Sequence, residues 1–131
     1  MNEKNLSDPS NIDRLSQIIQ SLKEKANLSG IILSYRDGRT IVKEIEGVHQ
    51  IDQFIPLIAS ALRSAEDLGI TVNGSTLHKI IAQLENFSIM ILKCSSKDVF
   101  LTLIINEASN LKPILENYEE LSKKIAKHIE I

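Results

Sequence analysis

The sequence predicts a single α+β domain, in which helices cover the faces of a five-stranded antiparallel sheet in the order α-β-β-α-β-β-β-α. Three observations support this fold class. Apolar residues recur at three- and four-residue spacing in three long segments, which indicates amphipathic helices. Short runs rich in branched side chains are separated by compact turns, which indicates strands. The 131 residues contain no internal repeat and no linker, as is typical of one domain.

The amino-terminal part predicts a polar segment, residues 1–11, followed by an amphipathic helix. Ser10 or Asn11 offers the side-chain oxygen that caps such a helix. We expect residues 12–131 to form one domain. The apolar face of its first helix consists of Ile12, Leu15, Ile18, Ile19, Leu22 and Ala26.

Residues Gly30–Tyr35 and Thr40–Ile45 predict two strands that form a hairpin. Asp37-Gly38 lies between them and predicts a tight turn, because this pair tolerates positive φ angles. The charges around the turn are most simply interpreted as a solvated hairpin tip.

Residues 51–68 predict a second helix that ends at Gly69. Pro56 lies about a turn inside it, which predicts an irregular start. The apolar stripe of this helix is wider than one sheet-facing side requires. It consists of Ile51, Phe54, Ile55, Ile58, Leu62 and Ala65, widened by Leu57, Ala61 and Leu68.

Residues 76–84, 87–94 and 99–105 predict three consecutive strands, and residues 111–129 predict the closing helix. The apolar spacing of 76–84 also fits a helix. We favour a strand because the segment is short and turn residues flank it. Pro113 is compatible with the first turn of the closing helix.

Composition and charge exclude several classes of function. Fifteen basic and seventeen acidic residues give a net charge of -2, which provides no attraction to a nucleic acid or an anionic membrane. No apolar run is long enough for a signal peptide or a transmembrane helix, so we expect neither. Cys94 is the single cysteine, which excludes disulfides within the chain, and we expect a reduced cytoplasmic setting.

The sequence shows no pattern that indicates catalysis, a cofactor or a metal site. It contains no P-loop and no dinucleotide-binding fingerprint. His49, His78 and His128 lie far apart, without the spacing of metal ligands. Cys94 lies in an apolar strand, where a buried and inert thiol is expected. We therefore predict a protein that is not an enzyme and has no cofactor.

The order of these elements resembles the roadblock family of dynein light-chain relatives. The resemblance covers about residues 12–129. Its local anchors are Gly30-Ile31-Ile32-Leu33-Ser34 leading into Arg36-Asp37-Gly38, the apolar helix 54–68, and the paired apolar strands before the last helix. It implies a profilin-like sandwich with two helices on one face of the sheet and one on the other. It also implies a dimer, with middle helices packed together and third strands paired edge to edge.

Physical reasoning also predicts an interface between copies, because the middle helix has more apolar surface than its own sheet can cover. The meander leaves an edge strand whose backbone groups are open to pairing with another chain. In the alternative interpretation, His78 and Lys79 guard that edge against pairing. The predicted dimer interface consists of Phe54, Leu57, Ile58, Ala61, Leu62, Ala65, Leu68, Leu77, Lys79 and Ile81.

The resemblance implies a Ras-like small GTPase as the partner of a homodimer, or of a heterodimer with a relative. The protein then acts as a scaffold or as a regulator of the nucleotide cycle of the GTPase. Candidate contacts to this partner are Arg36, Arg39, Arg63 and Asp67. The alternative is a monomeric profilin-like or sensor module that binds an actin-like partner or a small ligand.

Overall fold

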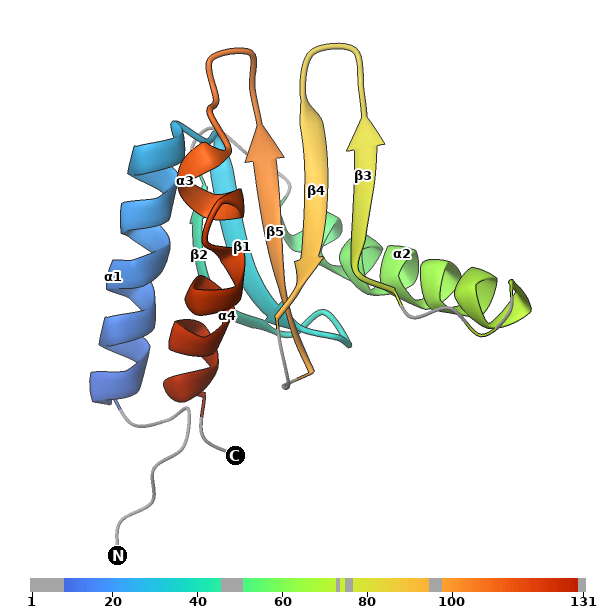
Figure 1. Cartoon of the computed structure of the whole chain (residues 1–131), viewed down its shortest axis with the longest axis horizontal. Coiled ribbons are helices and arrows are strands. Elements are labelled where there is room, and N and C mark those ends of the chain that lie inside the picture. The colour runs from blue at the N-terminus through green and yellow to red at the C-terminus, as the bar shows by residue number, and fades with distance from the viewer. Residues whose placement is uncertain (1–8, 46–50, 73, 75–76, 95–97, 130–131) are drawn as a thin grey trace, which may run out of the picture.

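A computed structural model describes residues 9–45, 51–72, 74, 77–94 and 98–129, with the backbone alone at 9–10 and 51–54. Its centre is a five-stranded sheet in the order β2-β1-β5-β4-β3, and every neighbouring pair is antiparallel (Figure 1). The strands are β1 (Gly30–Tyr35), β2 (Thr40–Ile45), β3 (Lys79–Gln83), β4 (Ser88–Lys93) and β5 (Val99–Ile105). The predicted sheet is confirmed, and the ambiguous third segment is a strand.

The helices cover the two faces of the sheet unequally. Helices α1 (Pro9–Ala26), α3 (Lys112–Leu115) and α4 (Tyr118–Lys127) lie over one face, while α2 (Ile51–Thr71) crosses the other (Figure 1). The carboxyl end of α2 runs past the edge strand β3 in this view. The predicted order of elements and their distribution over the two faces are therefore confirmed.

The side chains beneath α2 form the smaller of two buried clusters. On the face beneath α1, α3 and α4, a broad aliphatic cluster includes Leu15, Ile31 and Leu103, all fully buried. The cluster on the α2 face consists of Ile32, Ile58, Leu62, Ile91 and Phe100. The larger cluster makes the face under α1 the main core of the subunit.

Two buried hydroxyl groups weaken the packing beneath α2. Ser34 and Thr102 pair across the ladder with Phe100 and Ile32, so they share the α2 face with these core residues. Neither hydroxyl oxygen has a hydrogen-bond partner among the described residues. An unsatisfied buried hydroxyl costs about 1–3 kcal/mol. The layer formed by α2 is therefore less stabilised by its own subunit than the opposite layer.

One end of each of the first two long helices differs from the prediction. Helix α1 begins at Pro9, so Ser10 and Asn11 lie in its first turn and not at the position that precedes it. Proline fits the first turn because its nitrogen needs no hydrogen-bond partner there. Helix α2 continues through Gly69 to Thr71. A glycine inside a helix costs only about 1 kcal/mol. The helical pattern persists there, since the Val72 N–H donates to the Leu68 carbonyl oxygen at 3.0 Å.

The closing segment, predicted as one helix, forms two. The chain breaks between α3 and α4 at Glu116 and Asn117, where Asn117 has φ -123° and ψ 39°. After the break, the Tyr118 hydroxyl donates to the Lys93 carbonyl oxygen at 2.9 Å. This bond fastens α4 to the end of β4.

Candidate functional site

Helix α2 has three sides with different surroundings, because successive residues turn by about 100° around its axis. The first side faces the sheet and holds Ile58 and Leu62, which are 3% and 1% exposed. The second is an apolar flank formed by Leu57, Ala61, Ala65, Leu68 and Val72. The third is a charged flank, formed by Arg63, Glu66 and Asp67, that faces the tip of the β1–β2 hairpin.

The apolar flank is open to solvent in the isolated subunit. Leu57 and Leu68 are 63% and 64% exposed, and Val72 is exposed as well. Ala61 and Ala65 lie between them and are half-buried. The spacing of four, four, three and four residues forms a continuous ridge, and small residues at its centre allow another helix to approach closely.

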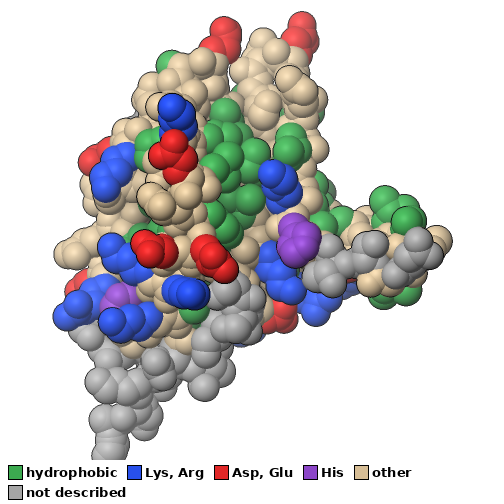
Figure 2. Space-filling view, in the orientation of Figure 1, with side chains coloured by type: hydrophobic (Ala, Val, Ile, Leu, Met, Phe, Trp, Pro, Cys, Tyr) green, Lys and Arg blue, Asp and Glu red, His purple; other side chains and the backbone are tan. Residues whose placement is uncertain are grey.

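A groove of about 520 Å³ continues this flank toward the edge of the sheet. Ala65, Leu68 and Val72 form one wall, while Leu77 and Lys79 belong to the other, at the start of β3. Figure 2 shows hydrophobic side chains at the projecting end of α2. The apolar flank and the edge strand are thus parts of one surface.

The free backbone groups of β3 can be assigned from its ladder with β4. The Leu84 N–H donates to the Phe87 carbonyl oxygen at 2.9 Å, and the Lys93 N–H donates to the His78 carbonyl oxygen at 3.2 Å. Hydrogen-bonded pairs alternate along an antiparallel ladder, so the even-numbered residues of β3 bond to β4. The N–H and C=O groups of Lys79, Ile81 and Gln83 therefore point to the open edge.

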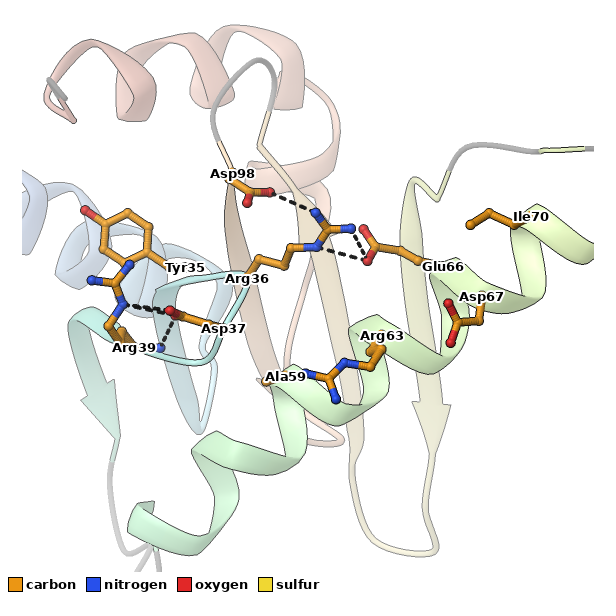
Figure 3. A pocket seen from close by; sticks show the side chains of 10 residues that line it. All are labelled: Tyr35, Arg36, Asp37, Arg39, Ala59, Arg63, Glu66, Asp67, Ile70 and Asp98. Carbon is orange, nitrogen blue, oxygen red and sulfur yellow. Dashed lines mark hydrogen bonds and ion pairs between the residues drawn. The ribbon is translucent and has the colours of Figure 1, made fainter.

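The charged flank borders a pocket of about 530 Å³ between α2 and the hairpin tip (Figure 3). Arg36 crosses it: its Nε lies 3.0 Å from Glu66 Oε1, and a second nitrogen also contacts that oxygen. The same guanidinium lies 3.9 Å from the carboxylate of Asp98, just before β5. The hydrogen bond to Glu66 raises the pKa of Arg36 above its ordinary value. Arg36 therefore joins the hairpin, α2 and β5.

A second ion pair closes the hairpin tip. Arg39 Nε lies 2.8 Å from Asp37 Oδ2, and the Arg39 guanidinium lies 4.6 Å from the centre of the Tyr35 ring. The backbone N–H of Arg39 also donates to Asp37 Oδ1 at 3.1 Å. The pKa of the Asp37 carboxyl lies below its ordinary value, mainly because of this backbone hydrogen bond.

Arg63 and Asp67 extend from α2 beside these ion pairs (Figure 3). Both side chains are exposed. In the part of the chain that the structure describes, neither side chain forms a hydrogen bond or an ion pair. They are the members of the pocket whose charges no group in the described part of the subunit matches.

The hairpin tip also contacts α2 through its glycine. Gly38 has a φ of 94°, and a Cβ atom placed on it would lie 3.3 Å from the Ile55 carbonyl oxygen and 3.4 Å from Ala59 Cβ. The tip thus touches α2 at Ile55 and Ala59, and again at Glu66 through Arg36. Two contacts separated by several residues fix the orientation of the tip relative to the helix.

Cys94 has the surroundings of an unreactive thiol. It is buried, and burial raises the pKa of its thiol to about 11. Its Sγ lies 3.6 Å from the hydroxyl of Tyr118, whose pKa burial also raises. The described residues include no group of three or more side chains suited to hold a metal ion. No described helix is long and apolar enough to cross a membrane.

The structure distributes the predicted interface residues over different surfaces. Ile58 and Leu62 are buried in their own subunit, which leaves them no surface for a second copy. Ile81 pairs with Met90 and lies on the sheet face opposite α2, and Lys79 shares that side. The side chain of Phe54 lies outside the described residues. The remaining predicted residues, Leu57, Ala61, Ala65, Leu68 and Leu77, lie along the apolar flank and its groove.

The structure brings all four predicted partner contacts, Arg36, Arg39, Arg63 and Asp67, into the single pocket beside the hairpin tip. Sequence reasoning missed Asp98, because nothing in the local sequence places it against a residue so far away along the chain. It also missed Val72 on the apolar flank. The spacing of four after Leu68 is the signal that could have found it, had the helix not been ended at Gly69.

No protein-family model and no curated protein matches the sequence. Solved structures do resemble it. The gliding protein MglB of Thermus thermophilus matches with a TM-score of 0.78 and 13% sequence identity over 90% of each chain. Myxococcus xanthus MglB matches with a TM-score of 0.75 and 15% identity, over 87% of this chain and 93% of that one. A Roadblock/LC7 domain from Streptomyces avermitilis matches with a TM-score of 0.69 and 14% identity, over 86% of this chain and 95% of that one. The chain has the roadblock-type fold.

The contact between the hairpin tip and α2 predicts that two glycines differ in how much their replacement by alanine destabilises the protein. Gly38 and Gly74 both have positive φ, but only Gly38 has atoms within 4 Å of an added Cβ. Gly38→Ala is expected to lower the free energy of unfolding by about 1 kcal/mol more than Gly74→Ala, because both variants strain the backbone and only one displaces α2. Urea unfolding of both variants measures this, and equal losses would contradict the contact.

Proposed function

We propose that this chain is a non-enzymatic roadblock-type protein that forms a homodimer and, as a dimer, binds a Ras-like small GTPase. The observation that carries the proposal is the apolar flank of α2, with Leu57 and Leu68 more than 60% exposed next to an open strand edge. Large exposed apolar surfaces of this kind mark protein interfaces. The roadblock-type fold supports the choice of partner.

The edge strand supports a dimer with a defined register. The outward backbone groups belong to Lys79, Ile81 and Gln83, and Ile81 is the middle residue of β3. An antiparallel pair with the two-fold axis at Ile81 places Lys79 opposite Gln83 of the second copy and Ile81 opposite itself. All three outward residues then exchange both of their backbone hydrogen bonds. Any other two-fold register places at least one of them opposite a residue outside β3.

This register also accounts for a second exposed apolar patch. Leu84 and Phe87, at the tip of the β3–β4 hairpin, are 49% and 40% exposed, and strand alternation places them on the α2 side of the sheet. The subunit's own α2 lies instead at the start of β3. In the proposed register the start of the partner's β3 faces the end of this one. The projecting end of the partner's α2 then covers Leu84 and Phe87.

The charged pocket remains accessible in such a dimer, because it lies on the opposite side of α2 from the apolar flank. We propose it as the contact surface for the GTPase. Contacts that differ between the GTP- and GDP-bound states of a partner shift its switch regions, without chemistry by the regulator itself. The protein then acts as a scaffold or changes the nucleotide cycle, and we place it in the cytoplasm.

The dimer predicts that a charge on the apolar flank separates the copies. Ala61→Glu is expected to convert the dimer to a monomer, because an unpaired carboxylate between two packed helices loses its hydration. Ser60→Glu adds the same charge on the exposed side of α2 and should leave the dimer intact. Sedimentation equilibrium gives the masses, and circular dichroism checks that both variants keep their helix content. A wild type that is monomeric at all concentrations would instead favour the profilin-like or sensor alternative.

The partner is tested with the purified Ras-like small GTPases of the source organism. Each is loaded with GDP or with a non-hydrolysable GTP analogue and titrated against the wild-type dimer by calorimetry. We expect one of them to bind with at least a tenfold preference for one nucleotide state, since a regulator must distinguish the two states. Absence of binding in either state would reject the GTPase as partner and leave the dimer standing.

A further inference from the structure

The arginines of the charged pocket are not equally available to a partner. The pocket contains three arginines and four carboxylates, with Arg36 held by Glu66 and Asp98, and Arg39 held by Asp37. Arg63 has no ion pair among the described residues. A partner that engages Arg36 or Arg39 must first separate an existing pair. Engaging Arg63 breaks no such interaction.

The same reasoning singles out Asp67 among the carboxylates. Glu66 and Asp37 each form an ion pair with an arginine, and Asp98 lies 3.9 Å from the guanidinium of Arg36. The carboxylate of Asp67 forms no described hydrogen bond or ion pair; only its backbone oxygen accepts one, from the Thr71 hydroxyl at 3.0 Å. Arg63 and Asp67 are therefore one unmatched positive and one unmatched negative charge, one helical turn apart.

The surrounding contacts hold this pair of charges in place. Glu66 lies between the two residues along α2 and is tied to the hairpin by Arg36. Gly38 packs against the preceding turn, at Ile55 and Ala59. Because the helix is fixed to the hairpin on both sides of Arg63, the two charged groups project from a backbone that has little freedom. A pre-organised surface of this kind loses less entropy on binding.

We propose that Arg63 and Asp67 determine partner specificity, with Arg63 binding a carboxylate of the partner protein and Asp67 binding a lysine or arginine about one helical turn away. This inference rests on the proposed function, and names the chemistry of the partner's surface. Opposite charges placed in a fixed order on two surfaces select the orientation of docking and reject wrong partners.

The composition of the pocket favours a side-chain carboxylate over a nucleotide phosphate as the group that Arg63 binds. Carboxylates outnumber guanidinium groups in the pocket by four to three. A multiply charged phosphate at Arg63 would be repelled by Asp67, which lies one helical turn away and has no ion pair among the described residues. A single carboxylate carries less charge and can approach Arg63 from the open side. Arg63 thus contacts the surface of the partner and leaves the phosphates to the partner's own residues.

The test measures the affinity of the dimer for the purified GTPase that binds the wild type. Arg63→Asp and Asp67→Arg are each expected to weaken binding at least tenfold, and the exchanged double variant, which restores the net charge, is expected to stay weak. Arg14→Asp on α1, outside the pocket, controls for net charge alone and should change the affinity less than threefold.

The possible outcomes separate this inference from the proposed function. A wild type that binds no GTPase overturns both. If the wild type binds but Arg63→Asp and Asp67→Arg keep its affinity, the proposed function stands and this inference is wrong. Full recovery of binding in the exchanged double variant would also overturn it, because only the net charge would then matter.

Discussion

The apolar flank of α2 is the constraint on which the rest of the account depends. The helix is anchored by Ile58 and Leu62 on a small buried cluster, and it leaves Leu57, Leu68 and Val72 exposed. Burying a leucine contributes roughly 1.5–3 kcal/mol, so the flank offers a second copy several kcal/mol of stabilisation. The same surface in a monomer would favour aggregation.

The arrangement of α2 separates two kinds of contact on one helix. Aliphatic residues on one flank are directed toward a second copy, and charged residues on the other are held by the β1–β2 hairpin. Arg36 holds the charged flank in place, because it joins the hairpin tip to α2 and to the start of β5. A dimer formed on the apolar flank therefore leaves the charged pocket free, and both surfaces share one rigid element.

The sequence predicted the order of elements and both layers because apolar periodicity and turn residues are local signals. It predicted an excess of apolar surface on α2 for the same reason. It placed Leu57 and Leu68 beside the main stripe, but it did not separate the sheet-facing Ile58 and Leu62 from the predicted interface. That separation depends on the angle at which α2 crosses the sheet, and sequence spacing does not contain this angle. Likewise, Arg36 pairs with Glu66 and Asp98 through tertiary contacts alone.

Hydrogen exchange at the edge strand tests the central claim most directly. The amides of Ile80 and Ala82 bond to β4 within the subunit, while the amide of Ile81 points to the open edge and needs a second copy. If two copies pair through β3, NMR will show the Ile81 amide of the wild type protected from exchange as strongly as its two neighbours. Rapid exchange at Ile81, with Ile80 and Ala82 protected, would contradict the account.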